Sequence, residues 1–193
     1  MLRNSNQPRV APVQPPYDAE TAAALEPLGP PLALFRVFAR RPERARAIHA
    51  WGRYYLSRQL ALSLRQRELV IDRVTALCGA EYEWGIHIDV FASKAGLSGE
   101  QVRSLTVGSP DDPVWDATDR AVLRAVDALH HEHDLSDEDW AGLVAAVGED
   151  GAVDLLLLAG WYHAISYVAR ATRLPSEDGT PTFAAVSPQG SSG

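Results

Sequence analysis

The sequence predicts an all-α fold, a single-domain helical bundle, and three observations carry that prediction. Alanine and leucine are abundant while β-branched residues are fairly sparse, a composition that favours helix. No stretch shows the alternation of apolar and polar residues that would require a sheet. Residues typical of helix ends recur along the chain. With 193 residues, 46% of them hydrophobic, the chain is long enough to bury a sizeable core.

Helix boundaries follow from three local signals: proline at a first helical position, serine followed three residues later by glutamine, and glycine after a helical run. Such signals, with one further serine cap, stand at Pro31, Pro42, Ser63–Gln66, Gly79, Gly96, Ser98–Gln101 and Ser136. The segment 108–113 (GSPDDP) reads as an internal linker. We therefore expect helices over about 31–40, 42–57, 63–78, 80–95, 98–107, 114–131, 136–147 and 150–173.

The two ends of the chain differ in composition from the part between them. Residues 1–16 are rich in Pro, Asn and Gln and predict a flexible arm, and residues 175–193 predict a disordered tail. The helical domain is expected over 17–174. Its last helix is apolar on most sides, as is typical of a central helix or a subunit interface. This pattern predicts a homo-oligomer.

Charge and hydropathy exclude several classes of partner. The net charge is −7, from 25 acidic and 18 basic residues, which disfavours broad binding to nucleic acid through phosphates. The longest apolar run, 155–162, is far shorter than the roughly 18 to 20 residues needed to span a bilayer. The first residues lack the apolar centre of a signal peptide. We expect a cytoplasmic protein that binds neither membrane nor nucleic acid.

An acid and an imidazole lie in the middle of the apolar arc of the expected helix 80–95. At about 100° per residue, Glu83 and His87 share one face, four residues apart. Both groups are costly in a core unless they are partnered. Glu83 can hold one ring nitrogen of His87 and leave the other free, the usual arrangement of a catalytic base and its orienting acid. One alternative is a structural pair that only fixes helix packing. A less favoured alternative is a metal site built on the same pair, for which no third ligand is clearly spaced.

Glu68, on the preceding expected helix, also has two interpretations. It lies at the border of a polar face that includes Asp72 and Thr75, and alone it would be an ordinary solvated glutamate. A sharp break at Gly79 would instead fold the two helices against each other. Glu68 could then face the same site as His87.

Residues 63–105 resemble the carboxymuconolactone decarboxylase family, which also contains the alkyl hydroperoxidase D-like proteins. The cues are RE before an apolar helix, then EYEWGIH, then AxxxGLSxEQV. Weaker similarity in the flanks extends the resemblance to about 31–173. It implies a helical bundle of the alkyl hydroperoxidase D-like type that assembles into trimers or hexamers, with a site between packed helices.

The peroxidase branch of that family uses a glutamate, a Cys-x-x-Cys and a histidine four residues after the second cysteine. Glu68 and His87 match the glutamate and the histidine, whereas Ala80 and Glu83 stand where the cysteines would be. Cys78 lies two residues before that pair and does not replace it. The resemblance is therefore compatible with the decarboxylase branch and puts thiol-relay chemistry in doubt.

Other residue clusters favour structural interpretations. Cys78, the single cysteine, falls on an apolar stripe and is expected to act as a small buried residue. The imidazoles of His130, His131 and His133 end a helix, where they complement its negative terminus, and a metal site that adds His163 is the less favoured alternative. Lys94 points the same way as His87, two turns further on, and either reaches solvent or receives a substrate carboxylate.

Together these observations predict an enzyme of the lyase class that works without a cofactor or a metal on a small molecule. The expected reaction is decarboxylation or proton transfer on a small carboxylated lactone or a related enolisable acid. The predicted catalytic residues are His87 as proton donor or shuttle, Glu83 setting its tautomer, and Glu68 completing the relay. The alternatives are a peroxide-reducing antioxidant protein that uses Cys78, and a non-catalytic oligomeric binding module.

Overall fold

The computed structural model describes residues 7–186, and within this range all regular structure is helical. This confirms the predicted fold class. The elements, in chain order, are α1 (Ala19–Leu25), the short 3₁₀ helix η1 (Glu26–Leu28), α2 (Ala33–Phe38), α3 (Pro42–Tyr55), α4 (Leu64–Leu77), α5 (Glu81–Phe91), α6 (Gly99–Val107), α7 (Ala117–His131), α8 (Asp137–Thr172) and α9 (Phe183–Val186).

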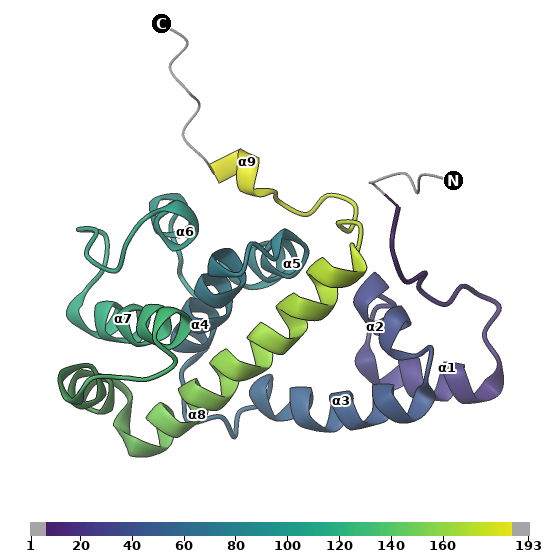
Figure 1. Cartoon of the computed structure of the whole chain (residues 1–193), viewed down its shortest axis with the longest axis horizontal. Helices are drawn as coiled ribbons and strands as arrows, with labels where there is room; N and C mark the ends of the chain where they lie inside the picture. The colour runs from purple at the N-terminus through teal and green to yellow at the C-terminus, as the bar shows by residue number, and fades with distance from the viewer. Residues whose placement is uncertain (1–6, 187–193) are drawn as a thin grey trace, which may run out of the picture.

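Four helices form the centre of the molecule. α4 packs between α7 and the long helix α8, and α5 lies against both α4 and α8 (Figure 1). Their shared core contains the fully buried side chains of Leu69, Val74, Trp84 and Leu155. The central position of α4 explains why nine consecutive residues of this helix, 67–75, are buried.

The first three helices form a smaller group at one end of α8. α1 and α2 pack on α3 (Figure 1), around a second core that contains Leu34 and Phe38. Tyr82 from α5 and Ile165 from α8 belong to the same core. The N-terminal helices are thereby fixed to the central bundle on the side where α5 meets α8.

The helix boundaries follow the predicted signals closely. Ser63 and Ser98 both form complete capping boxes with the glutamines three residues later, as their spacing predicts. The two expected helices 136–147 and 150–173 are consecutive parts of α8, separated by Gly148, which has the non-helical angles φ 76° and ψ 170°. Neither α1 nor α9 was predicted, and α9 lies in the segment expected to be a disordered tail. Asp18 caps α1 through a bond from the Thr21 amide.

Parts of both terminal segments lie against the helical body. Arg9 donates its backbone N–H to the carbonyl of Thr172 at 2.7 Å. Near the other end, the Glu177 carboxylate accepts bonds from the Ala33 amide and the Tyr82 hydroxyl, both at 2.6 Å. The outer parts of the expected arm and tail, 1–6 and 187–193, lie outside the described residues. Among the helices of residues 7–186, none is long and apolar enough to cross a membrane.

Candidate functional site

A tight turn brings α4 and α5 together and creates the site. Gly79 adopts φ +62°, a left-handed conformation that glycine takes without steric cost. The Ala80 amide then donates to the carbonyl of Thr75 at 2.8 Å, which closes the end of α4. The break expected at Gly79 therefore folds α5 back along α4, and Glu68 comes to face His87.

Glu68 lies at the centre of a buried charge network. Its side chain is completely buried, and each carboxylate oxygen has its own partner. Oε1 accepts the Nε–H of Arg67 at 2.6 Å, and Oε2 lies 2.8 Å from Nδ1 of His87. Arg67 and His87 are also buried, with 7% and 5% of their surface exposed. Of the two sequence interpretations of Glu68, the structure supports the one in which it faces the site.

The second ring nitrogen of His87 faces α8 and Glu83. Nε2 lies 3.1 Å from the hydroxyl of Tyr162, at hydrogen-bond distance, but 3.6 Å from Oε1 of Glu83. The expectation that Glu83 sets the tautomer of His87 is therefore not met in this geometry. Glu68 holds the ring instead. The packing of α4 against α5 brings the carboxylate of Glu68 closer to the His87 ring than that of Glu83, which lies one turn away on the same helix.

The network controls which groups carry charge. Burial alone would lower the pKa of His87, but its hydrogen bond to Glu68, the nearby carboxylate of Glu83 and the negative charges of both groups raise it to about 10. Asp72, one turn after Glu68, is fully buried, and burial raises the pKa of its carboxyl well above the ordinary value. The guanidinium of Arg67 and the charged imidazole of His87 thus face the carboxylates of Glu68 and Glu83, and burial favours the neutral form of Asp72.

One edge of this network reaches the molecular surface. Glu68 and Asp72 are wholly buried, whereas His87, Arg67 and Glu83 each retain a small exposed fraction. The ring of Phe91 lies beside this edge, 5.4 Å from the His87 ring between centroids. The guanidinium of Arg67 and the ammonium of Lys94 lie over the Phe91 ring, at 4.9 and 5.4 Å from its centroid. The exposed edge therefore combines the aromatic ring of Phe91 and two cations with the carboxylate of Glu83.

The described surface is hollowed elsewhere. Two hollows, of about 1000 and 240 Å³, open near Cys78 and near Gly79, and neither is lined by His87 or Glu83. The burial of its members makes the network a largely closed polar core with a narrow exposed edge. This closure is the feature that favours the interpretation of Glu83 and His87 as a structural pair.

The network also offers three ligand atoms at metal-binding distances. One atom each of Glu68, Asp72 and His87 lies within 4.8 Å of the others. Both oxygens of Glu68 are already engaged, however, and the Arg67 cation bonds directly to one of them. A divalent cation here would stand beside a guanidinium in a buried setting, so the geometry favours proton chemistry over metal binding.

Three members of the network were not identified from the sequence. The sequence pattern connects neither Tyr162 nor Arg67 to the site, and it places Asp72 only on a polar face beside Glu68. A signal exists for Tyr162, since a tyrosine in an otherwise apolar helix needs a partner for its hydroxyl. Arg67 is next to Glu68 in the sequence, and Asp72 is one turn further along the same helix. Because that helix is buried, both side chains need partners, and this need is the signal.

The remaining sequence candidates lie in other places. Cys78 is buried at the end of α4, and burial raises the pKa of its thiol, which disfavours the reactive thiolate of a peroxidase. His130 and His163 lie together between α7 and α8, 3.0 Å apart between ring nitrogens. His131 and His133 are exposed. None of these side chains joins the His87 network.

Comparisons with known proteins identify the fold. No family model matches the chain, and no curated protein matches it either. A solved structure from Agrobacterium tumefaciens, of unknown function and provisionally described as the antioxidant defence protein AhpD, is similar at a TM-score of 0.64. It has 21% identity, and the match covers 72% of this chain and 93% of that one.

Two further structures match over nearly the whole chain. An uncharacterized peroxidase-related protein from Silicibacter sp. TM1040 has a TM-score of 0.72 and 17% identity, with 94% of this chain and 99% of that one covered. A cysteine-to-alanine variant of the debrominase Bmp8, bound to 2,3,4-tribromopyrrole, has a TM-score of 0.72 and 15% identity, with 95% and 97% covered. At these identities the matches establish the fold, which is that of AhpD-like proteins.

Proposed function

We propose that this protein is a cofactor-free acid–base enzyme that decarboxylates or isomerises a small carboxylated lactone or a related enolisable acid. The observation that carries the proposal is the imidazole of His87, held between Glu68 and Tyr162 and kept charged by two carboxylates. A charged imidazole at neutral pH is a proton donor. Loss of carbon dioxide from the γ-carbon of an unsaturated lactone leaves a dienolate, and that intermediate must be protonated on carbon.

The bond directions support a second role in the same site. When His87 is charged, Nδ1–H donates to Glu68 and Nε2–H donates to the hydroxyl oxygen of Tyr162. The phenol proton of Tyr162 is then free to donate elsewhere. Burial raises the pKa of Tyr162 well above its ordinary value, so this proton stays in place. A neutral phenol beside a charged imidazole can stabilise a developing oxyanion. Because both N–H groups of His87 are engaged, its proton reaches the substrate carbon through Tyr162, which gives up its phenol proton and takes the Nε2 proton in return.

The exposed edge supports a carboxylated substrate. Arg67 and Lys94 lie over the ring of Phe91, next to His87. Arg67 is already paired with Glu68, whereas Lys94 is exposed. We therefore assign recognition of the substrate carboxylate to Lys94, with Phe91 contacting the ring of the substrate. The alternative of peroxide reduction has less support, because Cys78 is the single cysteine and lies outside this network.

The experiment compares turnover and folding in the same variants. Carbon dioxide release and ultraviolet absorbance are followed on a panel of carboxymuconolactone-type substrates, with a melting curve for each protein. His87→Leu should lower turnover by about 10² to 10⁴, the usual value of a general acid, while the protein stays folded. His131→Gln, which changes an exposed imidazole, is the matched control.

Two outcomes would contradict the proposal. Full turnover in His87→Leu would show that the imidazole is structural. A wild-type protein inactive on the whole panel, with His87→Leu more stable than the wild type, would favour the non-catalytic binding module. Lys94→Ala separates binding from chemistry, since it should raise KM and leave kcat nearly unchanged.

A further inference from the structure

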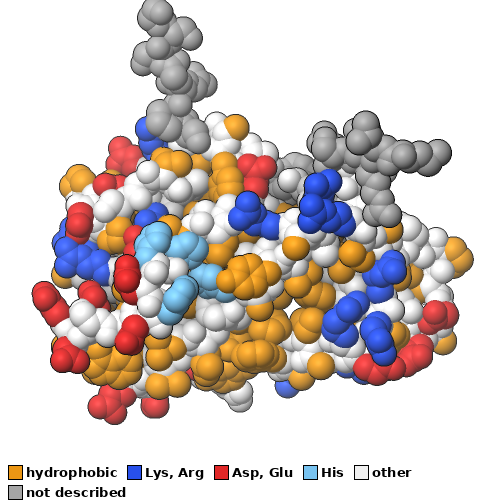
Figure 2. Space-filling model, viewed as in Figure 1, with side chains coloured by type: hydrophobic (Ala, Val, Ile, Leu, Met, Phe, Trp, Pro, Cys, Tyr) orange, Lys and Arg blue, Asp and Glu red, His pale blue; other side chains and the backbone are white. Residues whose placement is uncertain are grey.

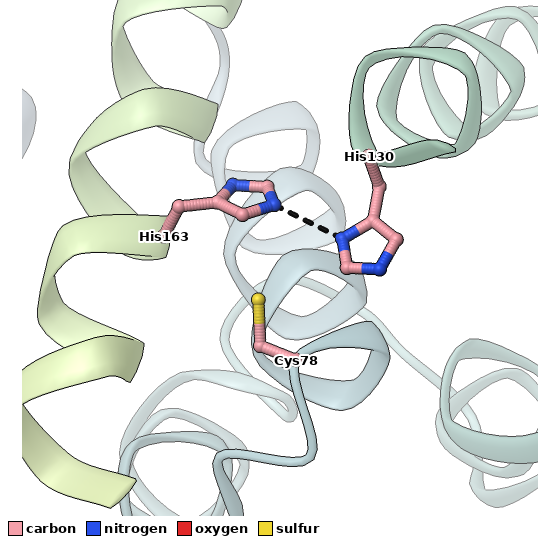
Figure 3. Close-up of side chains that lie close together, drawn as sticks. All are labelled: Cys78, His130 and His163. Atoms are coloured by element: carbon pink, nitrogen blue, oxygen red, sulfur yellow. Dashed lines mark hydrogen bonds between the residues drawn. The ribbon is translucent and has the colours of Figure 1, made fainter. Parts of the chain in front are cut away.

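A second group of ligand-type side chains lies outside the His87 network. Cys78 stands at the end of α4, His130 in the last turn of α7, and His163 within α8. Figure 3 shows the three side chains converging from these separate elements. Nδ1 of His130 and Nε2 of His163 are 3.0 Å apart, and the sulfur and one nitrogen of each imidazole all lie within 4.8 Å of one another.

We propose that Cys78, His130 and His163 bind a divalent metal ion of the zinc type, with three protein ligands and an open fourth position. One thiolate and two imidazoles are donors that zinc prefers. Tetrahedral zinc sets its nitrogen ligands about 3.3 Å apart and its nitrogen and sulfur ligands about 3.6 Å apart. The two imidazoles therefore need to separate by only a few tenths of an ångström, and the sulfur to approach by at most about 1.2 Å.

The hydrogen bonding around His163 fits the same role. Its Nδ1–H donates to the backbone carbonyl of Ala159 at 2.8 Å, which leaves Nε2 as an unprotonated lone pair directed at His130. Metal-bound histidines commonly donate their other ring N–H to a backbone carbonyl, because that bond fixes the ring orientation and the tautomer. His163 is thus held in the tautomer and orientation of a ligand.

The group also opens to a hollow large enough for a further ligand. The hollow of about 1000 Å³ is lined by all three residues, and Figure 2 shows histidine side chains gathered beside hydrophobic surface on this face. Arg170 lines it as well, with its guanidinium bonded to the Cys78 carbonyl. That positive charge favours a thiolate and an anionic fourth ligand, such as hydroxide or a small carboxylate. Three protein ligands and an open position are typical of catalytic zinc.

Metal binding at these atoms is balanced without a redox step. The thiol of Cys78 loses its proton to solvent and forms the metal–sulfur bond. His130, which donates Nδ1–H to His163 in the metal-free state, binds the metal through Nδ1 and carries its proton on Nε2 instead. Each ion bound therefore releases one proton. The three protein ligands together then carry one negative charge, on the thiolate of Cys78. This proposal does not depend on the proposed chemistry at His87.

The test uses the full chain, stripped of metal and titrated with Co²⁺ and then Zn²⁺. Because Cys78 is the single cysteine of the sequence, a thiolate-to-cobalt charge-transfer band reports on this site alone. We expect the band to saturate at one Co²⁺ per chain and to disappear when Zn²⁺ is added. Zn²⁺ should also protect Cys78 from alkylation by iodoacetamide in the unmutated protein.

Variants separate this site from other metal-binding positions. Cys78→Ser and His163→Gln each remove a ligand, so each should weaken Zn²⁺ binding by more than the roughly 10- to 100-fold that loss of an outer-shell partner costs, with helix content unchanged by circular dichroism. His131→Gln changes an exposed histidine at the same end of α7 and should bind as the wild type does. The proposal is overturned if the wild type gives no charge-transfer band, or if Zn²⁺ leaves alkylation of Cys78 unchanged.

Discussion

Replacing Glu68 with glutamine tests the charge network at the centre of the molecule. The substitution keeps the size of the side chain and removes the negative charge that Arg67 and His87 share. Glutamine can still accept one of the two bonds through its amide oxygen. Its NH₂ group, however, would then point a donor at the other cation. Both cations are buried, so water cannot replace the lost partner.

The expected cost follows from burial and from the pKa of His87. Removing one partner of a buried ion pair typically costs about 3–5 kcal/mol, because the other charge is left uncompensated. The difference between the raised and the ordinary pKa of His87 corresponds to at most about 5 kcal/mol. Glu83 supplies part of that stabilisation and remains in the variant. We therefore expect Glu68→Gln to lower the free energy of unfolding by about 3–5 kcal/mol.

The pH dependence gives a second, independent readout. The pKa of His87 lies above its ordinary 6.5, so its charge stabilises the folded protein fully below that pH and this contribution is lost as the pH rises toward about 10. In Glu68→Gln the pKa of His87 should fall, because burial then opposes the charge with one carboxylate fewer. The variant should lose less stability than the wild type between about pH 6.5 and 10.

Urea denaturation across that pH range measures both effects, and the chemical shifts of the His87 ring follow its titration directly. Glu149→Gln, on an exposed turn of α8, is the matched control and should change stability by less than about 0.5 kcal/mol. If Glu68→Gln is as stable as this control, or if its imidazole still titrates near pH 10, the described charge network is wrong.

Two further predictions concern the surface of the bundle. Three large hydrophobic side chains of α8 are each about half exposed or more: Val153, Leu157 and Tyr167. We therefore predict an oligomer. Light scattering should give a mass above the 21.0 kDa of one chain, with Leu157→Glu shifting it downward; a monomeric wild type would refute this. A Cβ at Gly85 would lie 2.6 Å from the Pro181 carbonyl oxygen, so Gly85→Ala should displace the C-terminal segment. Proteolysis should then cut near Pro181 faster than in the wild type, and equal rates would contradict that packing.

The sequence alone determined the helices and the class of fold, since both depend on local interactions. The capping boxes at Ser63 and Ser98 act within one turn, and the left-handed turn at Gly79 depends on a residue without a side chain. Such features can be recognised in any sequence, because they depend only on residues that are neighbours in the chain. Of the missed helices, α1 begins at an aspartate cap, Asp18, which was not among the signals used, and α9 has only four residues.

The candidate sites depended on how the helices pack, which no local pattern specifies. Spacing within one helix correctly placed Glu83 and His87 on the same face, but the carboxylate that holds His87 comes from α4 at 2.8 Å. Its other partner, Tyr162, comes from α8, 75 residues away in the sequence. Cys78 meets His130 and His163 for the same reason. A helix constrains its own residues over one turn, whereas the crossing of two helices is set by the whole core, and only the tertiary structure decided which side chains meet.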